Sequence, residues 1–339
     1  MLNLELKKPS VVFFHRKPRS VGNYSVEYIF EDVRIRLKDR ITAITAVSTH
    51  ESSGLFNRIA NCFEAFRKQG TVNHITGDVN YLSLFLNKKR TINTILDCVH
   101  LNSSSGIKYK ILKYFWLTIP ERRSRFITAI SESTKNEILK HHQCNPEKIV
   151  VIPVAISPGF KFKERSFNVS CPRILQVGTA PNKNIPNLIE AIKGISCILH
   201  IVGKSNSMYE EMLQKNNIQY VYESGLTNEE IINRYEQSEI ISLVSTYEGF
   251  GMPILEAQAV GRVVITSNVY SMPEVAGESA VIVDPHDITS IRTGLLRIIQ
   301  DSQFRDDCIR KGFENIKRFD PDLIASQYYG LYKAIADDL

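Results

Sequence analysis

The chain has 339 residues, of which 43% are hydrophobic and 23% are charged, and its formal net charge is +6. This composition excludes a disordered chain, a collagen-like chain and a disulfide-dense scaffold, and the length suggests two domains. The excess positive charge lies in residues 1–160, whereas residues 161–339 are net acidic, which suggests two bodies with different partners.

In the first half, short apolar runs alternate with helical stretches, a pattern typical of a parallel sheet covered on both faces. The expected strands are 11–14, 41–47, 73–76, 92–96, 125–130 and 149–152. The expected helices are one near 26–30 and others at 55–68, 107–120 and 132–142. The alternation predicts a doubly wound α/β domain.

Residues 153–172 interrupt this pattern with prolines and charged residues, and we interpret them as a domain linker. The pattern then restarts, with strands expected at 174–177, 197–202, 220–222, 240–244, 263–266 and 280–283. Helices are expected at 185–192, 208–213, 228–237, 253–260, 287–300 and 322–336. We therefore predict domains at 1–157 and 158–320, with a final helix within 321–339 that packs back on the first domain.

The strand expected at 240–244 leads into a glycine-rich loop that reads STYEGFGMPILE over 245–256. Gly249 and Gly251 permit tight turns, and Pro253 suits the first turn of a helix, whose amide groups would attract a phosphate. Glu248 and Glu256 could accept hydrogen bonds from vicinal hydroxyl groups. Together these residues predict a ligand that is both phosphorylated and polyhydroxylated.

This string resembles the E-x7-E motif of retaining glycosyltransferases of family 4. The segment 177–184 resembles the first strand and loop of that family's donor domain, and 257–261, 264–267, 272–275 and 283–285 follow in the family's order. Residues 128–135 and 151–154 of the first half are also similar. The resemblance implies the GT-B fold, in which two Rossmann-like domains with doubly wound parallel sheets face each other across a cleft.

The family resemblance implies transfer of a sugar, with retention, from a UDP- or GDP-linked sugar to a saccharide or lipid-linked saccharide in surface polysaccharide synthesis. It implies that Glu256 binds the nucleotide ribose, that Glu248 binds sugar hydroxyls, and that Lys183 neutralises the departing diphosphate. A lysine in a loop before a helix start suits that last role. The implied donor-binding residues are Gly178, Thr179, Lys183, Glu248, Gly249, Phe250, Gly251, Met252 and Glu256.

The sequence departs from the family's pattern at two places. Thr179 stands where many members have an arginine, so this cation is either missing or supplied by Arg16, Arg19 or Lys204. Many members also carry a His-Asp pair after the fourth strand. Here that strand ends in Leu96-Asp97, and His100, which we consider a catalytic candidate, follows three residues later.

Acceptor contacts are expected from two loops of the first half. The basic loop at 15–25 contains Gly22 and Asn23, and the third strand ends near His74 and Asp78. Both loops follow strands and therefore face the ligand edge of a parallel sheet, although Asp78 is equally suited to a helix N-cap. The basic, aromatic segment 108–125 is either a membrane-surface element or a core helix with exposed basic ends.

No resident cofactor and no metal are expected, because the D-x-D string at 320–322 opens a helix instead of ending a strand. The six cysteines show no C-x-x-C spacing and no secretory signal is recognisable. We therefore expect a cytoplasmic protein, peripheral on the inner face of the membrane if the segment 108–125 binds there. Nucleic acid is not an expected partner. A nucleotide-sugar epimerase of the same fold and a non-catalytic nucleotide-binding module remain alternatives.

Overall fold

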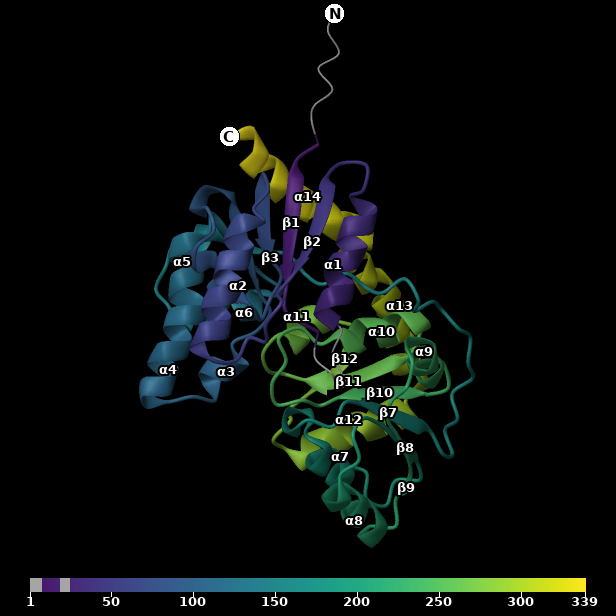
Figure 1. Ribbon diagram of the computed structural model, residues 1–339. Coiled ribbons are helices and arrows are strands. Elements are labelled where there is room, and N and C mark those ends of the chain that lie inside the picture. Colours follow the sequence, from purple (N-terminus) through teal and green to yellow (C-terminus); the bar gives the residue numbers. More distant parts are fainter. Residues whose placement is uncertain (1–7, 19–24) are drawn as a thin grey trace, which may run out of the picture. The chain divides into compact units, whose positions relative to one another are not determined.

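The computed structural model describes residues 8–18 and 25–339, and the chain divides into two compact units (Figure 1). Unit 1 comprises Met1–Ala155 and Pro321–Leu339, and unit 2 comprises Ile156–Asp320. The chain therefore leaves unit 1 once, builds the whole of unit 2, and returns to unit 1 for its last helix.

Unit 1 contains a six-stranded parallel sheet in the order β2-β1-β3-β4-β5-β6. Its strands are β1 (Ser10–His15), β2 (Thr42–Val47), β3 (Val72–Ile75), β4 (Thr91–Ile95), β5 (Phe126–Ala129) and β6 (Ile149–Val151). Because side chains alternate along β1, Val11 and Phe13 pack into one apolar cluster and Val12 and Phe14 into another. The sheet is therefore covered on both faces, as its near-continuous apolar strands predict.

The helices of unit 1 divide between these two faces. They are α1 (Ser25–Arg36), α2 (Leu55–Arg67), α3 (Val99–Asn102), α4 (Gly106–Lys113), α5 (Ile119–Arg123), α6 (Glu132–His141) and α14 (Pro321–Asp337). Helices α1 and α14 supply the cluster around Phe13, and α2 supplies the cluster around Phe14. The short helical turns are η1 (Asn80–Leu84), η2 (Lys88–Arg90), η3 (Tyr114–Thr118) and η4 (Pro146–Lys148).

One long helix was expected at 107–120, and the structure shows α4 and α5 joined by the π-helical turn η3. The physical reason lies in Pro120, which has no N–H to bond to the carbonyl four residues earlier. A wider π turn accommodates this missing bond and keeps the chain helical.

Unit 2 contains a second six-stranded parallel sheet, in the order β12-β11-β10-β7-β8-β9. Its strands are β7 (Arg173–Val177), β8 (Ile198–Val202), β9 (Gln219–Glu223), β10 (Ile240–Leu243), β11 (Val263–Ser267) and β12 (Ala280–Val283). The two sheets confirm the predicted α/β class with doubly wound parallel strands.

The helices of unit 2 include two, α11 and α13, that the sequence patterns did not indicate. The helices are α7 (Ile185–Ala191), α8 (Ser207–Lys215), α9 (Asn228–Glu236), α10 (Met252–Val260), α11 (Met272–Ala276), α12 (Ile288–Gln300) and α13 (Ser302–Asn315), with the 3-10 turns η5 (Pro181–Lys183) and η6 (Ile316–Phe319). Helix α13 was missed because its segment is rich in charged residues and its buried side includes Arg305, Cys308 and Gly312, which do not form an apolar stripe. Its start is fixed by Asp301, whose carboxylate accepts a hydrogen bond from the Phe304 amide. Among the described residues, no helix is both long and apolar enough to cross a lipid bilayer.

Candidate active site

The candidate site lies at the carboxyl edge of the second sheet, beyond the neighbouring strands β7 and β10. Successive strands are added on the β8 side of β7 and then on the β10 side, so this pair marks the switch point where ligands bind in doubly wound sheets. The loops that follow these two strands are tied together. The Asn182 carbonyl accepts a hydrogen bond from the Thr246 amide at 2.8 Å, and Asn182 Nδ2 donates to the Tyr247 carbonyl at 2.9 Å.

Lys183 and Glu248, which the sequence pattern assigned to the same ligand, form an ion pair across these loops. The Lys183 Nζ to Glu248 Oε1 distance is 2.7 Å, and their side chains are only 17% and 14% exposed. The Ser245 hydroxyl donates to the same carboxylate oxygen at 2.7 Å. Gly178 has a φ of +86°, and a Cβ there would lie 2.9 Å from Lys183 Cε, so a glycine lets the lysine cross the end of β7.

Helix α10 begins at this loop, and its N-cap residue provides no side-chain hydrogen bond to the first amide groups. Its N-cap is Gly251, in a left-handed conformation with a φ of 105°, and Pro253 lies in the first turn. The Ser271 hydroxyl holds the loop by donating to the Glu248 carbonyl at 2.9 Å and to the Phe250 carbonyl at 2.8 Å. The ring of Phe250 is buried, so this residue can contact a ligand only through its backbone. The helix start provides a fixed anion site.

Glu256 lies on the second turn of α10 and is held by a buried tyrosine. The Tyr235 hydroxyl donates to Glu256 Oε2 at 2.5 Å, and the structure gives no other hydrogen bond to this carboxylate among the residues it describes. Burial raises the pKa of Glu256, while the Tyr235 hydrogen bond and the charge of Lys183 lower it. The second carboxylate oxygen is thus available to hydroxyl groups of a ligand.

The element that carries Tyr235 is itself fixed by charge. Arg234, the preceding residue on α9, donates to both carboxylate oxygens of Glu223, at 2.6 Å to Oε2 and 2.9 Å to Oε1. Glu223 ends β9 and also lies 2.5 Å from His200 Nε2, and the hydrogen bond from Arg234 is the main reason that its pKa falls to about 2. A capping box between Thr227 and Glu230 starts the helix.

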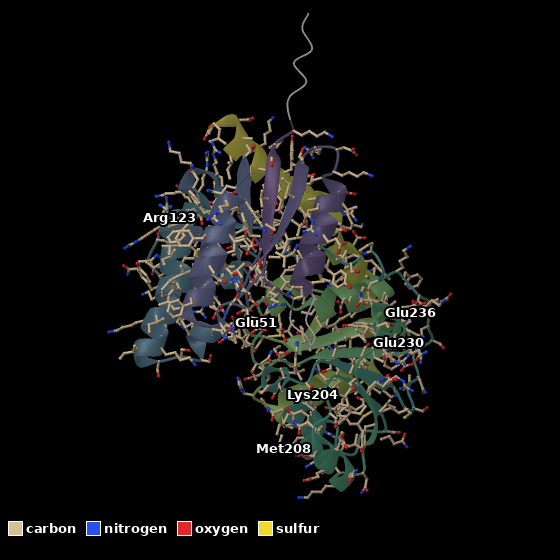
Figure 2. All side chains as sticks on the ribbon, in the orientation of Figure 1. Glu51, Arg123, Lys204, Met208, Glu230 and Glu236 are labelled. Atoms are coloured by element: carbon tan, nitrogen blue, oxygen red, sulfur yellow. The ribbon has the colours of Figure 1, made fainter. Side chains whose placement is uncertain are left out.

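Thr179 contacts the backbone of Lys204, one of the proposed replacement cations. Its hydroxyl donates to the Lys204 carbonyl at 2.9 Å, and the Tyr222 hydroxyl donates to the same carbonyl at 3.1 Å. The backbone of Gly203 approaches so closely that a Cβ would lie 2.7 Å from Thr179 Cγ2. Lys204 is exposed on this loop of unit 2 (Figure 2). Arg16 instead pairs with Asp78 in unit 1, and Arg19 lies outside the described residues.

In unit 1, the structure brings together two of the predicted residues and buries a third. His100, exposed on α3, and Asp78 line one small pocket that Asn80, Asp97 and Trp116 also border. Asp78 has a φ of 52° and forms an ion pair with Arg16, and the N-cap of the following turn η1 is Val79 instead. Gly22 and Asn23 lie outside the described residues.

His74 is a core residue, and the expectation that it contacts an acceptor was wrong. Its side chain is fully buried, with Nδ1 2.8 Å from the Tyr332 hydroxyl and Nε2 2.8 Å from the Thr94 hydroxyl. Burial lowers the pKa of His74 to about 3, which keeps the ring neutral. A histidine at the end of a strand can be either a buried core residue or a ligand contact, and the sequence alone does not distinguish these two roles.

Several residues of the site in unit 2 were not predicted. Ser245 lies in the 245–256 string and Asn182 in the segment 177–184. Their polar side chains, close in sequence to Glu248 and Lys183, could therefore have indicated that they belong to the site. Tyr235 and Ser271 reach the site from other elements, and no local pattern indicates them. Among the described residues, no group of three or more His, Cys, Asp or Glu side chains could hold a metal ion.

Comparison with known proteins identifies relatives for unit 2 and for the whole fold. Residues 160–315 match the family of glycosyl transferases group 1. O-antigen chain mannosyltransferase B of Escherichia coli is 25% identical over 238 residues, covering 62% of this chain and 61% of the relative. MMP alpha-(1->4)-mannosyltransferase of Mycolicibacterium hassiacum is 27% identical over 229 residues, covering 62% and 54%. The chain thus spans little more than half of these curated relatives.

Solved structures resemble the chain over nearly its whole length. HepE of Anabaena, crystallised with UDP and glucose, has a TM-score of 0.79 at 13% identity, covering 96% of this chain and 100% of that one. Sucrose-phosphate synthase of Thermosynechococcus elongatus has the same TM-score at 15% identity, covering 97% and 100%. These likenesses confirm the GT-B fold, and the family match confirms the resemblance to group 1 glycosyltransferases.

Proposed function

We propose, from the group 1 glycosyltransferase domain that residues 160–315 form, that this protein transfers a sugar from a nucleotide diphosphate sugar to an acceptor hydroxyl. One observation carries the proposal: the Lys183–Glu248 ion pair lies beside the uncapped start of α10, whose second turn presents Glu256. A cation, a helix start and two carboxylates in one place suit a ligand that has both phosphates and hydroxyl groups.

Each of these groups has a role in the proposed reaction. The oxygen of Glu256 left unbonded by Tyr235 accepts hydrogen bonds from the ribose, and the amides of residues 249–252 bind the diphosphate. Lys183 exchanges its bond with Glu248 for one with the phosphate, while Ser245 keeps Glu248 oriented toward the sugar hydroxyls. The bond between the anomeric carbon and the phosphate oxygen breaks, and the acceptor oxygen forms its new bond to that carbon on the same face while its proton passes to the departing diphosphate, so configuration is retained. Lys183 and the helix start stabilise the charge on the departing diphosphate.

The exposed Lys204 is the cation that best replaces the arginine missing at Thr179. Hydrogen bonds to its carbonyl from Thr179, which follows β7, and from Tyr222 fix its backbone next to the loop after β7, and its side chain is exposed there. Arg16 is a weaker candidate because Asp78 already neutralises it. Lys204 would add a second positive charge against the diphosphate.

For the substrates, we infer a UDP- or GDP-linked sugar and a saccharide or lipid-linked saccharide of a surface polysaccharide. Support for the nucleotide comes from HepE, crystallised with UDP, and support for the polysaccharide comes from the O-antigen mannosyltransferase. We place the acceptor on unit 1, where His100 and Asp78 line a pocket with Trp116. The reaction would take place in the cytoplasm, without a metal ion or a resident cofactor.

The test is product analysis by mass spectrometry with a panel of UDP- and GDP-linked sugars, together with nucleotide-induced thermal shifts. Wild type should release nucleoside diphosphate only when an acceptor is present. Glu256→Gln should weaken nucleotide binding, whereas Lys215→Ala, an exposed lysine on α8, should not. An epimerised nucleotide sugar without transfer would replace the proposal by the epimerase alternative, and nucleotide binding without turnover on any donor would favour a binding module.

A further inference from the structure

Tyr270 has a strained backbone at the ligand edge of the second sheet. It lies in the loop between β11 and α11 and has a φ of 55°. The other non-glycine residues of the described structure that have a positive φ are all aspartate or asparagine, namely Asp78, Asn184 and Asn217. Short polar side chains tolerate this left-handed conformation, whereas a bulky side chain such as tyrosine is strained in it. A strained residue at a ligand edge points to a function that requires its side chain.

Burial does not explain why a tyrosine occupies this position, because Tyr270 is 44% exposed. Its ring packs edge-on against the ring of Tyr247, with 4.5 Å between the ring centroids and an angle of 64° between the ring planes. One aromatic contact of this kind stabilises a protein by no more than a bulky residue in the left-handed conformation costs. The fold alone therefore gains little from a tyrosine at this position.

The two tyrosines lie next to the loop that carries Glu248. Tyr247 directly precedes Glu248, and its carbonyl accepts a hydrogen bond from Asn182 Nδ2 at 2.9 Å. Ser271 directly follows Tyr270, and its hydroxyl donates to the Glu248 carbonyl at 2.9 Å. Both aromatic side chains therefore extend from backbone that is held beside Glu248, the residue to which the proposed function assigns the hydroxyl groups of the donor sugar.

We propose that Tyr270, supported by Tyr247, is a stacking residue for the pyranose ring of the donor sugar. A pyranose has hydroxyl groups around its rim and C–H groups on its faces. These C–H groups are weakly positive and are attracted by the negative face of an aromatic ring. Glu248 binds the hydroxyl groups while the exposed ring of Tyr270 covers an apolar face, so the site recognises both parts of a sugar. The inference rests on the proposed function and adds a residue that selects for a sugar ring.

The experiment is isothermal titration of UDP, UDP-glucose, GDP and GDP-mannose into wild type and three variants. Tyr270→Gly removes the ring and relieves the backbone, whereas Tyr270→Phe keeps the ring. Tyr270→Gly should bind the nucleotide alone like wild type, and should bind the nucleotide sugar that wild type uses about five- to tenfold more weakly. Tyr270→Phe should bind both like wild type.

The third variant, Asn217→Gly, is the matched control. Asn217 is exposed, has a φ of 52°, and lies between α8 and β9 at the opposite edge of the same sheet. This variant should bind every ligand like wild type. A thermal melt tests the strain separately: Tyr270→Gly should melt about 2–4 °C above Tyr270→Ala, because only glycine adopts the left-handed conformation without strain.

Four results would overturn the stacking proposal. These are unchanged affinity of Tyr270→Gly for the nucleotide sugar, an equal loss for the nucleotide alone, an equal loss in Tyr270→Phe, and an equal loss in Asn217→Gly. Equal melting temperatures of Tyr270→Gly and Tyr270→Ala would remove the strain on which the proposal depends. Wild type that turns over no nucleotide sugar would refute the proposed function, whereas normal turnover together with an unaffected Tyr270→Gly would refute the stacking residue alone.

Discussion

Because Tyr235 donates one hydrogen bond to Glu256, the contribution of its hydroxyl group to nucleotide binding can be measured with a single substitution. Tyr235→Phe removes the hydroxyl and leaves the ring in its fully buried position, where it packs edge-on against Phe160 at 5.2 Å between ring centroids. Glu256 Oε2 then loses its only donor within the described structure. The variant therefore perturbs one carboxylate and little else.

The expected loss of nucleotide affinity in Tyr235→Phe depends on the negative charge of the Glu256 carboxylate that accepts this hydrogen bond. A hydrogen bond to a charged group contributes about 1.5–3 kcal/mol, and a share of about 1.4 kcal/mol lost from nucleotide binding corresponds to about tenfold weaker affinity. Burial raises the pKa of Glu256, and the Tyr235 hydrogen bond lowers it. Without that hydrogen bond the pKa of Glu256 rises further. As the pH is lowered, Glu256 is therefore protonated at a higher pH, and the ionised carboxylate that binds ribose is lost earlier. The acidic limb of nucleotide binding should move to higher pH in the variant.

The assay is isothermal titration of UDP and GDP into wild type and Tyr235→Phe across the acidic pH range. Tyr220→Phe is the matched control, because the hydrogen bond that its hydroxyl accepts within the described structure, at 3.3 Å, comes from the exposed Gln214. Circular dichroism verifies that both variants fold. Equal affinities and superimposable pH profiles for wild type and Tyr235→Phe would refute the positioning role of Tyr235.

Three further predictions concern the lysine, the glycine beneath it and the buried histidine. Lys183→Ala should lower turnover by at least about a hundredfold at unchanged thermal stability, since it removes the cation that faces the leaving group; near-normal turnover in the product assay would contradict this. Gly178→Ala should cost more stability in urea unfolding than Gly194→Ala, because both have a positive φ but a Cβ at Gly194 meets nothing within 4 Å; equal costs would contradict the close approach. His74 has a folded pKa of about 3 against 6.5 when unfolded, so the unfolded chain binds more protons between these values and stability falls as pH is lowered from 6.5 toward 3. His74→Leu should remove up to about 1.4 kcal/mol per pH unit of that slope, and an unchanged slope would show that another group causes it.

The strands and the chemistry of the 245–256 loop could be predicted because each depends on residues that are close together in the sequence. Apolar runs such as 240–244 and 263–266 correspond to β10 and β11, and the glycine and proline of the 245–256 string coincide with the observed start of α10. The parallel sheet then follows from the alternation of strands with helices. That Glu248 meets Lys183 follows from the switch point, which the strand order determines.

The remaining features depend on contacts between distant elements. Tyr235 reaches Glu256 from another helix, and the side chains that bury His74 include Tyr332, which lies 258 residues later in the chain. Helix α2 was correctly expected, yet its sequence does not say which side of the helix faces the sheet, because both sides carry apolar residues.

Because the chain returns to unit 1 for α14, unit 1 is completed only after unit 2 has been synthesised. Strand β3 places His74 early in synthesis, but the tyrosine that bonds to it follows the whole of unit 2. A growing chain can complete unit 2 while the apolar cluster around Phe13 and Phe30 still lacks Tyr328, Tyr332 and Ile335. Until the ribosome releases α14, that side of the first sheet is covered by α1 but not by α14, so docking of α14 completes the cluster, and the nascent chain exposes its apolar residues to aggregation until then.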